Sequence, residues 1–345
     1  MIFFVNNEHK RSFLFLLIFF IAFQSQSPFS YSSPAPLGSF QKSLDILKDQ
    51  LKQKGKKNIV IAPQLIALSN LAADKMKCIL RNETPFPIPY VGTSIKGFHL
   101  VSKSVNIDEH LPKFNLPYTS SSQLAQQTTT LFAEELNSKI TRETHGMIQD
   151  FVEEDLLNSP TIKYIIYSWL YQKVAWEKPF SPYKKTLSWN GEENSQIRWM
   201  EKETAMGYIT RSNLGLISIP VKEDGIKAVV IFNKERHIHL SQTEDILWLL
   251  ENFTGLEQKF RLVIPQCNFT YSFFDNSLDQ HSKHSAALKI NHQGVEVGAA
   301  SYHSSYRGFR RAPPEEVIIN HSFIFGLVKD DSLIAAAYIH QPWVN

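Results

Sequence analysis

The segment His284–Pro342 constrains the fold of this chain more than any other part of the sequence. Ala286–Ile290 alternates like a strand, and two apolar runs, Phe323–Val328 and Leu333–Ile339, close the chain. The two aspartates between these runs favour a tight turn, so the runs predict a β-hairpin. A long irregular stretch separates the first strand from the hairpin. Such stretches in compact domains are usually functional or disordered.

The irregular stretch has two parts of different composition. Its first part is rich in small residues and forms a candidate hinge: Gly294, Val295, Glu296, Val297, Gly298, Ala299 and Ala300. Small residues suit a segment that must enter a densely packed sheet, because bulky side chains would obstruct it. The second part is a polar, basic tip that ends before two prolines: Arg307, Gly308, Phe309, Arg310, Arg311 and Ala312.

The length and charge of the chain narrow the function classes. Its 345 residues allow one large domain or two ordinary ones, and the formal net charge is only +3. This small charge, without a long basic tract, does not favour a nucleic-acid partner. His237 and His239 could share a strand face and meet His281 or His303, but no tight ligand cluster predicts a metal site. No phosphate loop or catalytic motif is present, so we expect no cofactor and no enzyme.

The N-terminus has the pattern of a secretory signal peptide. Three basic or imidazole side chains precede the apolar run Phe13–Phe23, which is too short to span a bilayer comfortably. A membrane anchor is the alternative interpretation. We expect a signal peptide over residues 1–27 and a flexible Ser/Pro-rich linker over residues 28–38.

Secretion would make some glycosylation sequons functional. Four occur, at Asn82, Asn252, Asn268 and Asn320, and the first three are the candidates, because Asn320 lies beside a predicted core strand. Two cysteines, Cys78 and Cys267, form no disulfide framework, and pairing or burial as free thiols both remain open.

Hydrophobic periodicity predicts several elements before the C-terminal segment. The helices expected are Ser39–Lys54, Gln64–Arg81, Leu124–Lys139 and Asp245–Phe253. The strands expected include Asn58–Pro63, Phe98–Val105, Thr161–Val174, Ile197–Tyr208, Leu216–Pro220 and Ala228–Phe232, and Phe260–Phe274 is expected to contain strands with Pro265 between them.

The order of these elements and several short motifs resembles the serpin superfamily. Thr144, Gly146 and Ile148 fit one family phrase, and Trp176 with Phe180 fits another. Asn320–Phe325 takes the place of the phrase Asn-x-Pro-Phe-x-Phe, with Ser322 where proline is usual. The resemblance spans residues 39–343. Each motif is weak by itself, and their correct order makes the match specific.

The resemblance implies an α+β serpin fold in a single domain over residues 39–345. This fold has an N-terminal helical region, a large central mixed β-sheet, a buried C-terminal β-hairpin and an exposed reactive-centre loop at about residues 294–314. The chain is shortened relative to the family around residues 82–97 and between Phe274 and His284.

The family mechanism implies a secreted monomer whose partner is a serine protease. A protease attacks the exposed loop, and the cut loop then inserts into the central sheet as a new strand. Counting from Gly294 places the scissile bond at Gly308–Phe309, whereas counting back from Asn320 places it at Arg311–Ala312. The arginines of the tip suit a trypsin-like, Arg-specific enzyme.

Three residues are implied in the control of the sheet. His284 matches the shutter histidine of the family, Trp176 matches the residue that caps the sheet where the loop enters, and Ser168 replaces a strand asparagine. The family's two shutter serines are Ala62 and Leu65 here. These departures, together with Val295 and Val297 in the hinge, favour an alternative: a non-inhibitory carrier, decoy or binding protein with the same fold.

Overall fold

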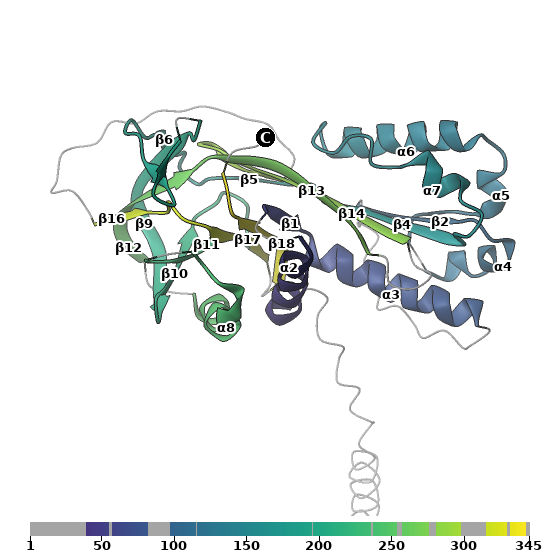
Figure 1. Ribbon diagram of the computed structural model, residues 1–345, viewed down its shortest axis with the longest axis horizontal. Helices are drawn as coiled ribbons and strands as arrows, with labels where there is room; N and C mark the ends of the chain where they lie inside the picture. The colour runs from purple at the N-terminus through teal and green to yellow at the C-terminus, as the bar shows by residue number, and fades with distance from the viewer. Residues whose placement is uncertain are drawn as a thin grey trace, which may run out of the picture. The chain divides into compact units, whose positions relative to one another are not determined.

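The computed structural model describes residues 39–54, 57–81, 97–114, 116–194, 196–235, 237–253, 257–275, 281–297, 315–329 and 332–342 (Figure 1). All of them belong to one compact unit, Leu37–Asn345. Its helices are α2 (Phe40–Lys54), α3 (Pro63–Leu80), α4 (Val105–Asp108), α5 (Ser121–Leu124), α6 (Thr129–Glu143), α7 (Glu154–Asn158) and α8 (Thr243–Asn252), with 3-10 turns η1 (Leu111–Phe114) and η2 (Leu240–Gln242).

Two large sheets organise the strands. The seven-stranded central sheet has the order β3-β2-β4-β14-β15-β5, and β13 pairs with β14 from Ser282 to Ile290. Its strands are β2 (Phe98–Ser102), β3 (Tyr118–Thr119), β4 (Tyr164–Trp169), β5 (Gln172–Ala175), β13 (Cys267–Asp275), β14 (His281–Ile290) and β15 (Gly294–Val297).

The second sheet has nine strands in the order β1-β18-β17-β11-β10-β9-β12-β16, and β6 pairs with β9. Its strands are β1 (Ile59–Ile61), β6 (Ser181–Pro182), β9 (Trp199–Arg211), β10 (Leu214–Ile219), β11 (Ile226–Asn233), β12 (Glu257–Pro265), β16 (Glu316–Ile318), β17 (Phe323–Lys329) and β18 (Ser332–Ile339). A separate small ribbon joins β7 (Ser188–Trp189) to β8 (Glu192–Glu193).

Helices cover both faces of the central sheet because its strands alternate apolar side chains on both sides. On β4, Ile165 and Tyr167 pack into the core that contains α6 and α7, whereas Tyr164 and Ile166 pack into the core that contains α3. Figure 1 shows these helices on opposite faces of β4 and β14. This alternation directs Ser168 to the α3 face, which is the face of the candidate site.

The predicted C-terminal hairpin is present. β17 and β18 pair from Phe323 opposite Ile339 to Lys329 opposite Ser332, and nearly all their residues are buried. β17 also pairs with β11 along its length, so the hairpin lies inside the second sheet. A strand flanked on both edges and packed on both faces has a continuous apolar sequence, as β17 does.

Several predicted elements have different bounds in the structure, among them the strand predicted over Ile197–Tyr208, which is β9 (Trp199–Arg211). The strand expected over Phe98–Val105 ends at Ser102, because Ser104 precedes α4. The helix expected over Leu124–Lys139 is α6 and begins at Thr129, where the Thr128 hydroxyl caps the amide of Leu131 at 3.2 Å. The long strand expected over Thr161–Val174 is divided into β4 and β5.

Candidate functional site

The hinge enters the central sheet between β5 and β14. Gly294 lies opposite Ala175 and Val295 opposite Val174 on one side, while Val295 lies opposite Ile290 on the other. Both ladders are antiparallel. Gly294–Val297 belongs to the loop predicted to be exposed, so this part of the prediction is corrected. The reason is that a β-branched valine suits a strand between two others, and Val295 is buried there.

Close backbone contact explains the glycine at the start of β15. A Cβ atom at Gly294 would lie 2.3 Å from the carbonyl oxygen of Val174. Any larger residue would therefore require β5 and β15 to separate. The small size of the hinge is a packing requirement at this position.

A tight turn joins β14 to β15. The Asn291 side-chain oxygen accepts hydrogen bonds from the amides of Gln293 at 2.8 Å and Gly294 at 3.2 Å. The amide of Asn291 donates to the Gly294 carbonyl at 3.0 Å. This asparagine turn fixes the point at which the chain reverses into the sheet.

Trp176 holds this turn from the side of β5. Its indole N–H donates to the Asn291 carbonyl at 2.8 Å, and its amide donates to the Gln293 carbonyl at 3.1 Å. The amide of Phe180 donates to the His292 carbonyl at 2.7 Å. Trp176 and Phe180 thus hold the backbone of the turn that leads into β15.

A buried lysine lies against the same aromatic pair. The Lys202 ammonium lies 6.0 Å from the Trp176 ring centroid and 5.3 Å from that of Phe180, and these two rings are 5.3 Å apart. It has no hydrogen-bond partner within the described residues. Burial lowers the Lys202 pKa to about 8, while the nearby Glu177 opposes this change. Attraction to Glu177 and cation–π contact with the two rings are the interactions that favour the charged form of Lys202.

Further along the sheet, β4 and β14 pair directly and in parallel. Ile165–Trp169 lies opposite His281–Ser285, which places Ser168 opposite His284. β15 therefore separates β5 from β14 at one end of the sheet, whereas β4 and β14 pair directly at the other end. The boundary falls between the β5 segment and β4, which is why the single predicted strand is divided.

The Ser168 hydroxyl and His284 Nδ1 lie 2.5 Å apart, and both side chains are buried. Burial lowers the His284 pKa to about 3, so the imidazole is neutral at physiological pH. A neutral imidazole provides one donor and one acceptor. Ser168 forms a hydrogen bond with Nδ1 of the His284 ring, so Nε2 needs a different hydrogen-bond partner.

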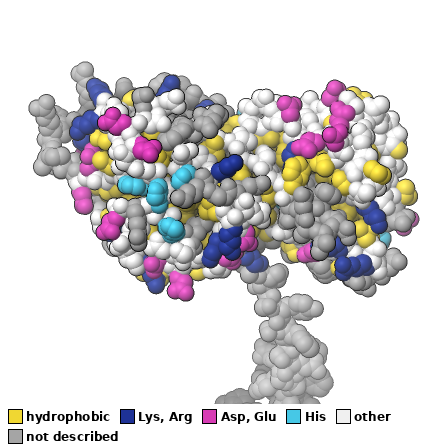
Figure 2. Space-filling model, in the orientation of Figure 1, with side chains coloured by type: hydrophobic (Ala, Val, Ile, Leu, Met, Phe, Trp, Pro, Cys, Tyr) yellow, Lys and Arg dark blue, Asp and Glu magenta, His cyan; other side chains and the backbone are white. Residues whose placement is uncertain are grey.

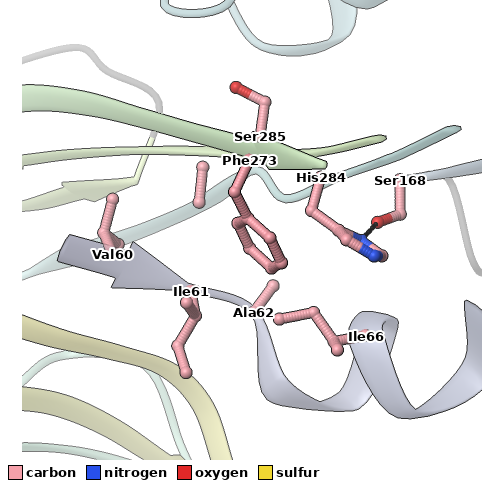
Figure 3. A pocket seen from close by; sticks show the side chains of 9 residues that line it. Val60, Ile61, Ala62, Ile66, Ser168, Phe273, His284 and Ser285 are labelled. Atoms are coloured by element: carbon pink, nitrogen blue, oxygen red, sulfur yellow. Dashed lines mark hydrogen bonds between the residues drawn. The ribbon is translucent and has the colours of Figure 1, made fainter. Parts of the chain in front are cut away.

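The second nitrogen of His284 faces apolar surroundings. Figure 3 shows the residues around it, which line a small cavity between β1, α3, β4 and β14: Val60, Ile61, Ala62, Ile66, Phe273 and Ala286. His284 Nε2 has no hydrogen-bond partner among the described residues. Ala62 stands where the family has a serine, so only one half of the polar network is present. The Phe273 ring, 4.9 Å from the imidazole centroid, packs against it instead.

The remaining candidate residues divide into described and undescribed positions. Gly298, Ala299, Ala300, Arg307, Gly308, Phe309, Arg310, Arg311, Ala312 and Asn82 lie outside the described residues. Asn252 and Asn268 are exposed, whereas Asn320 is half-buried and its carbonyl accepts from the amide of Asn190. Both cysteines are free, Cys267 being buried and Cys78 half-buried.

The histidines expected as a possible cluster have other neighbours. The His237 ring lies 5.9 Å from that of His321 and 6.0 Å from that of His340. No group of three potential ligands in the described part of the chain could hold a metal ion. Within the same part, no helix is long and apolar enough to cross a membrane.

Sequence reasoning missed Lys202 and Asn291. A lysine two residues after Met200 on an amphipathic strand gives no sign of burial by itself, since its aromatic partners are distant in sequence. Asn291, followed three residues later by glycine, is a turn signal that could have placed the start of β15.

A sheet that is closed at one end and separated at the other by the start of a long loop defines a class of proteins. In this class a loop can add a strand to its own sheet. The sequence matches the family model "Serpin (serine protease inhibitor)" over residues 101–278, which is more than half of the chain. The chain belongs to the serpin family, and the predicted family and fold are confirmed.

Solved structures agree on the fold. Human thyroxine-binding globulin has 13% identity and a TM-score of 0.63, with 89% of this chain and 98% of that chain covered. Serpin48 of the insect Tenebrio molitor has 14% identity and a TM-score of 0.61, with 89% and 97% covered. Native protease nexin-1 with heparin has 14% identity and a TM-score of 0.63, with 88% and 98% covered. Comparison with the sequences of curated proteins gives no match.

Proposed function

We propose that this serpin inhibits trypsin-like serine endopeptidases by cleavage and insertion of its reactive loop. One observation carries the proposal: Gly294–Val297 already forms a strand between β5 and β14. Insertion after cleavage would extend this strand rather than begin a new one. At the end of the sheet where β5 lies, these four residues already separate β5 from β14 in the intact chain.

Extension of β15 between β4 and β14 would replace the one ladder between those strands with two ladders, one on each edge of the inserted strand. The β4–β14 contact is parallel, and a strand continuing from β15 would be antiparallel to both of its neighbours. Antiparallel pairing is slightly more stable per residue than parallel pairing. Each inserted residue would also bring backbone groups that form hydrogen bonds on both sides, which favours insertion once the loop is cut.

The existing register predicts where each inserted residue would go. Val297 lies opposite Gln172, and Glu296 lies opposite Lys289. Continuing both ladders by one residue at a time brings Ser301 opposite Ser168 and also opposite His284. Both ladders give the same answer, and Ser168 already lies opposite His284. Ser301 would therefore enter between them and add a hydroxyl beside the imidazole.

The arginines of the loop support a trypsin-like target. The specificity pocket of such enzymes carries a carboxylate that pairs with an arginine side chain. Arg311–Ala312 and Gly308–Phe309 remain the two candidate bonds, and Arg307 and Arg310 offer further positions for attack. Arg311 precedes the Arg311–Ala312 bond, which makes this bond a suitable cleavage site for a trypsin-like enzyme.

Incubation with trypsin followed by a denaturing gel tests the proposal. We expect a covalent complex, and mass spectrometry of the released peptide should place the cut after Arg311. The Arg311→Ala variant should lose the complex, with Arg307→Ala as the matched control that retains it. Clean cleavage of the wild-type protein without a complex would reject inhibition.

The half-complete polar network favours a second function. His284 Nε2 lacks a partner in the described part of the structure, and Ala62 provides none. A non-inhibitory carrier, decoy or binding protein would not need a sheet that opens under control. In that case cleavage leaves the melting temperature unchanged, since the loop does not insert.

Secretion as a glycosylated monomer belongs to the same proposal. The apolar N-terminal run and the exposed side chains of Asn252 and Asn268 support it. Expression with the native N-terminus in a eukaryotic cell should deliver the protein to the medium without residues 1–27. Its mass should fall on treatment with an N-glycan-removing enzyme, and retention in the cells would contradict the proposal.

A further inference from the structure

A basic pocket lies beside the turn that leads into β15. It has a volume of about 470 Å³ and is formed by β6, the residues after it, the start of β9, and the turn after β14. Cationic and imidazole side chains on its wall are Lys184, Lys185, Arg198 and His292. This volume lies in the range of sites for small organic ligands.

Within the described part of the chain, no ion pair neutralises the charges of Lys184, Lys185 and Arg198. No acidic side chain is among the lining residues of the pocket. These three side chains are exposed, so their ammonium and guanidinium groups are available to a ligand. Figure 2 shows Lys and Arg side chains together with Asp and Glu side chains over the part of the molecule that contains β6 and β9.

The rest of the lining combines apolar and aromatic side chains with two polar ones, Thr186 and Gln266. Pro182, Tyr183, Ile197 and Trp199 contribute to the lining, and Trp199 is only 5% exposed. The buried indole N–H of Trp199 has no acceptor among the described residues. An apolar floor with a few convergent polar groups is the usual composition of a small-molecule site.

Backbone hydrogen bonds hold the walls in place. The amide of Tyr183 donates to the Trp199 carbonyl at 3.1 Å, and the amide of Gln266 donates to the Arg198 carbonyl at 2.8 Å. The His292 carbonyl accepts from the amide of Phe180 at 2.7 Å. The site is therefore preformed, which reduces the ordering cost of binding.

We propose that this pocket binds a small organic anion with an aromatic body and a sulfonate, sulfate, phosphate or carboxylate group. The anionic group contacts Lys184, Lys185 and Arg198, and the aromatic body packs against Tyr183 and Trp199. Binding needs neither loop cleavage nor insertion, so it stands or fails independently of protease inhibition.

Matched fluorescent compounds test both parts of the ligand. 8-Anilinonaphthalene-1-sulfonate has the aromatic body and the charge, N-phenyl-1-naphthylamine has the body alone, and inorganic sulfate has the charge alone. We expect the sulfonate to bind to the full-length protein at least about tenfold more tightly than either of the others. Trp199→Phe should reduce energy transfer from tryptophan to the bound sulfonate.

Charge-reversed variants locate the site. Lys184→Glu with Arg198→Glu should weaken the sulfonate by about tenfold or more. The control, Lys42→Glu with Lys163→Glu, changes the net charge equally at exposed positions far from the pocket in the sequence, and should bind as the wild type does. Lys184→Gln with Arg198→Gln replaces the first pair if circular dichroism shows that it does not fold.

Two results would overturn the proposal. Equal affinity of both charge-reversed proteins for the sulfonate would place its binding elsewhere. Equal affinity of the wild type for the sulfonate and the uncharged amine would show that the basic wall does not contribute. Tight binding of sulfate alone would reject the aromatic part and leave a simple anion site, contrary to the proposed ligand.

Discussion

Ser168 and His284 lie opposite each other on β4 and β14, and their side chains are 2.5 Å apart, Ser168 Oγ to His284 Nδ1. This contact lies in the closed part of the central sheet, beyond the end of β15. Any strand that continues from Val297 between β4 and β14 must separate the two side chains. The hydrogen bond therefore opposes extension of the hinge in the intact protein.

The first prediction concerns acid stability. His284 has a folded pKa of about 3, below its unfolded value of 6.5, so it stabilises the fold above pH 6.5 and loses this contribution as the pH falls toward 3. At pH 5 the loss is about 2 kcal/mol. Urea unfolding at pH 7 and pH 5 should show that His284→Gln has a smaller difference between the two than the wild type.

His99 provides the control for this measurement. Burial lowers its pKa to about 4, with a smaller effect of Lys139, so it contributes over nearly the same pH range. His99→Gln should reduce the loss of stability between pH 7 and pH 5 by a similar amount. The double variant should show the sum of the two reductions, since the sites are separate. A pH dependence unchanged in His284→Gln would contradict the burial of a neutral imidazole.

The second prediction concerns the register of insertion. If Ser301 enters between Ser168 and His284, an arginine there would bury an unpaired charge and prevent closure of the strand. Ser301→Arg should convert the protein from an inhibitor into a substrate, with the covalent complex falling by about tenfold or more in a denaturing gel. Ser301→Ala is the matched control and should retain the complex. Complex formation by Ser301→Arg at the wild-type level would show a different register.

The third prediction concerns Gly294. A Cβ atom there would lie 2.3 Å from the Val174 carbonyl oxygen, so Gly294→Ala must displace β15 from β5. We expect a loss of about 1–3 kcal/mol of stability, by the usual cost of overpacking. Hydrogen exchange should become faster at the amides of residues 294–297. Gln293→Ala, one position earlier in the turn, should leave this exchange unchanged, and equal protection in both variants would argue against the β5–β15 contact.

The fourth prediction concerns Lys202. Its folded pKa of about 8 lies below the unfolded value of 10.5, so the folded state releases its proton first and stability rises with pH from about 8 to 10.5. Lys202→Met fills similar space without a charge and should stabilise the fold at pH 7 by about 1–3 kcal/mol. Thermal melts at pH 7 and pH 10 measure both effects.

The rise in stability between these two pH values should disappear in Lys202→Met. Lys259→Met is a useful comparison, because that lysine lies on the neighbouring strand β12 with its side chain 59% exposed. It should alter neither the stability nor its pH dependence by more than about 0.5 kcal/mol. A destabilised Lys202→Met protein would show that the cation–π contact outweighs the cost of burying the charge.

The sequence by itself determined the family, the C-terminal hairpin and the composition of the hinge. These properties depend on local patterns: alternating residues before Gly294, two apolar runs at the end, and small residues between them. The order of the motifs indicated the family, and the match to the family model over residues 101–278 agrees with that assignment. Local periodicity also located most helices and strands, although it placed the start of α6 several residues early.

Only the tertiary structure decided that Gly294–Val297 lies within the sheet and that Ser168 reaches His284. Both depend on register between strands that are more than a hundred residues apart in the sequence, and register follows from packing across the whole sheet. The same holds for Lys202, whose burial depends on the distant rings of Trp176 and Phe180. A side chain's own sequence neighbours contain no information about such partners, because the free energy that selects them comes from the assembled core.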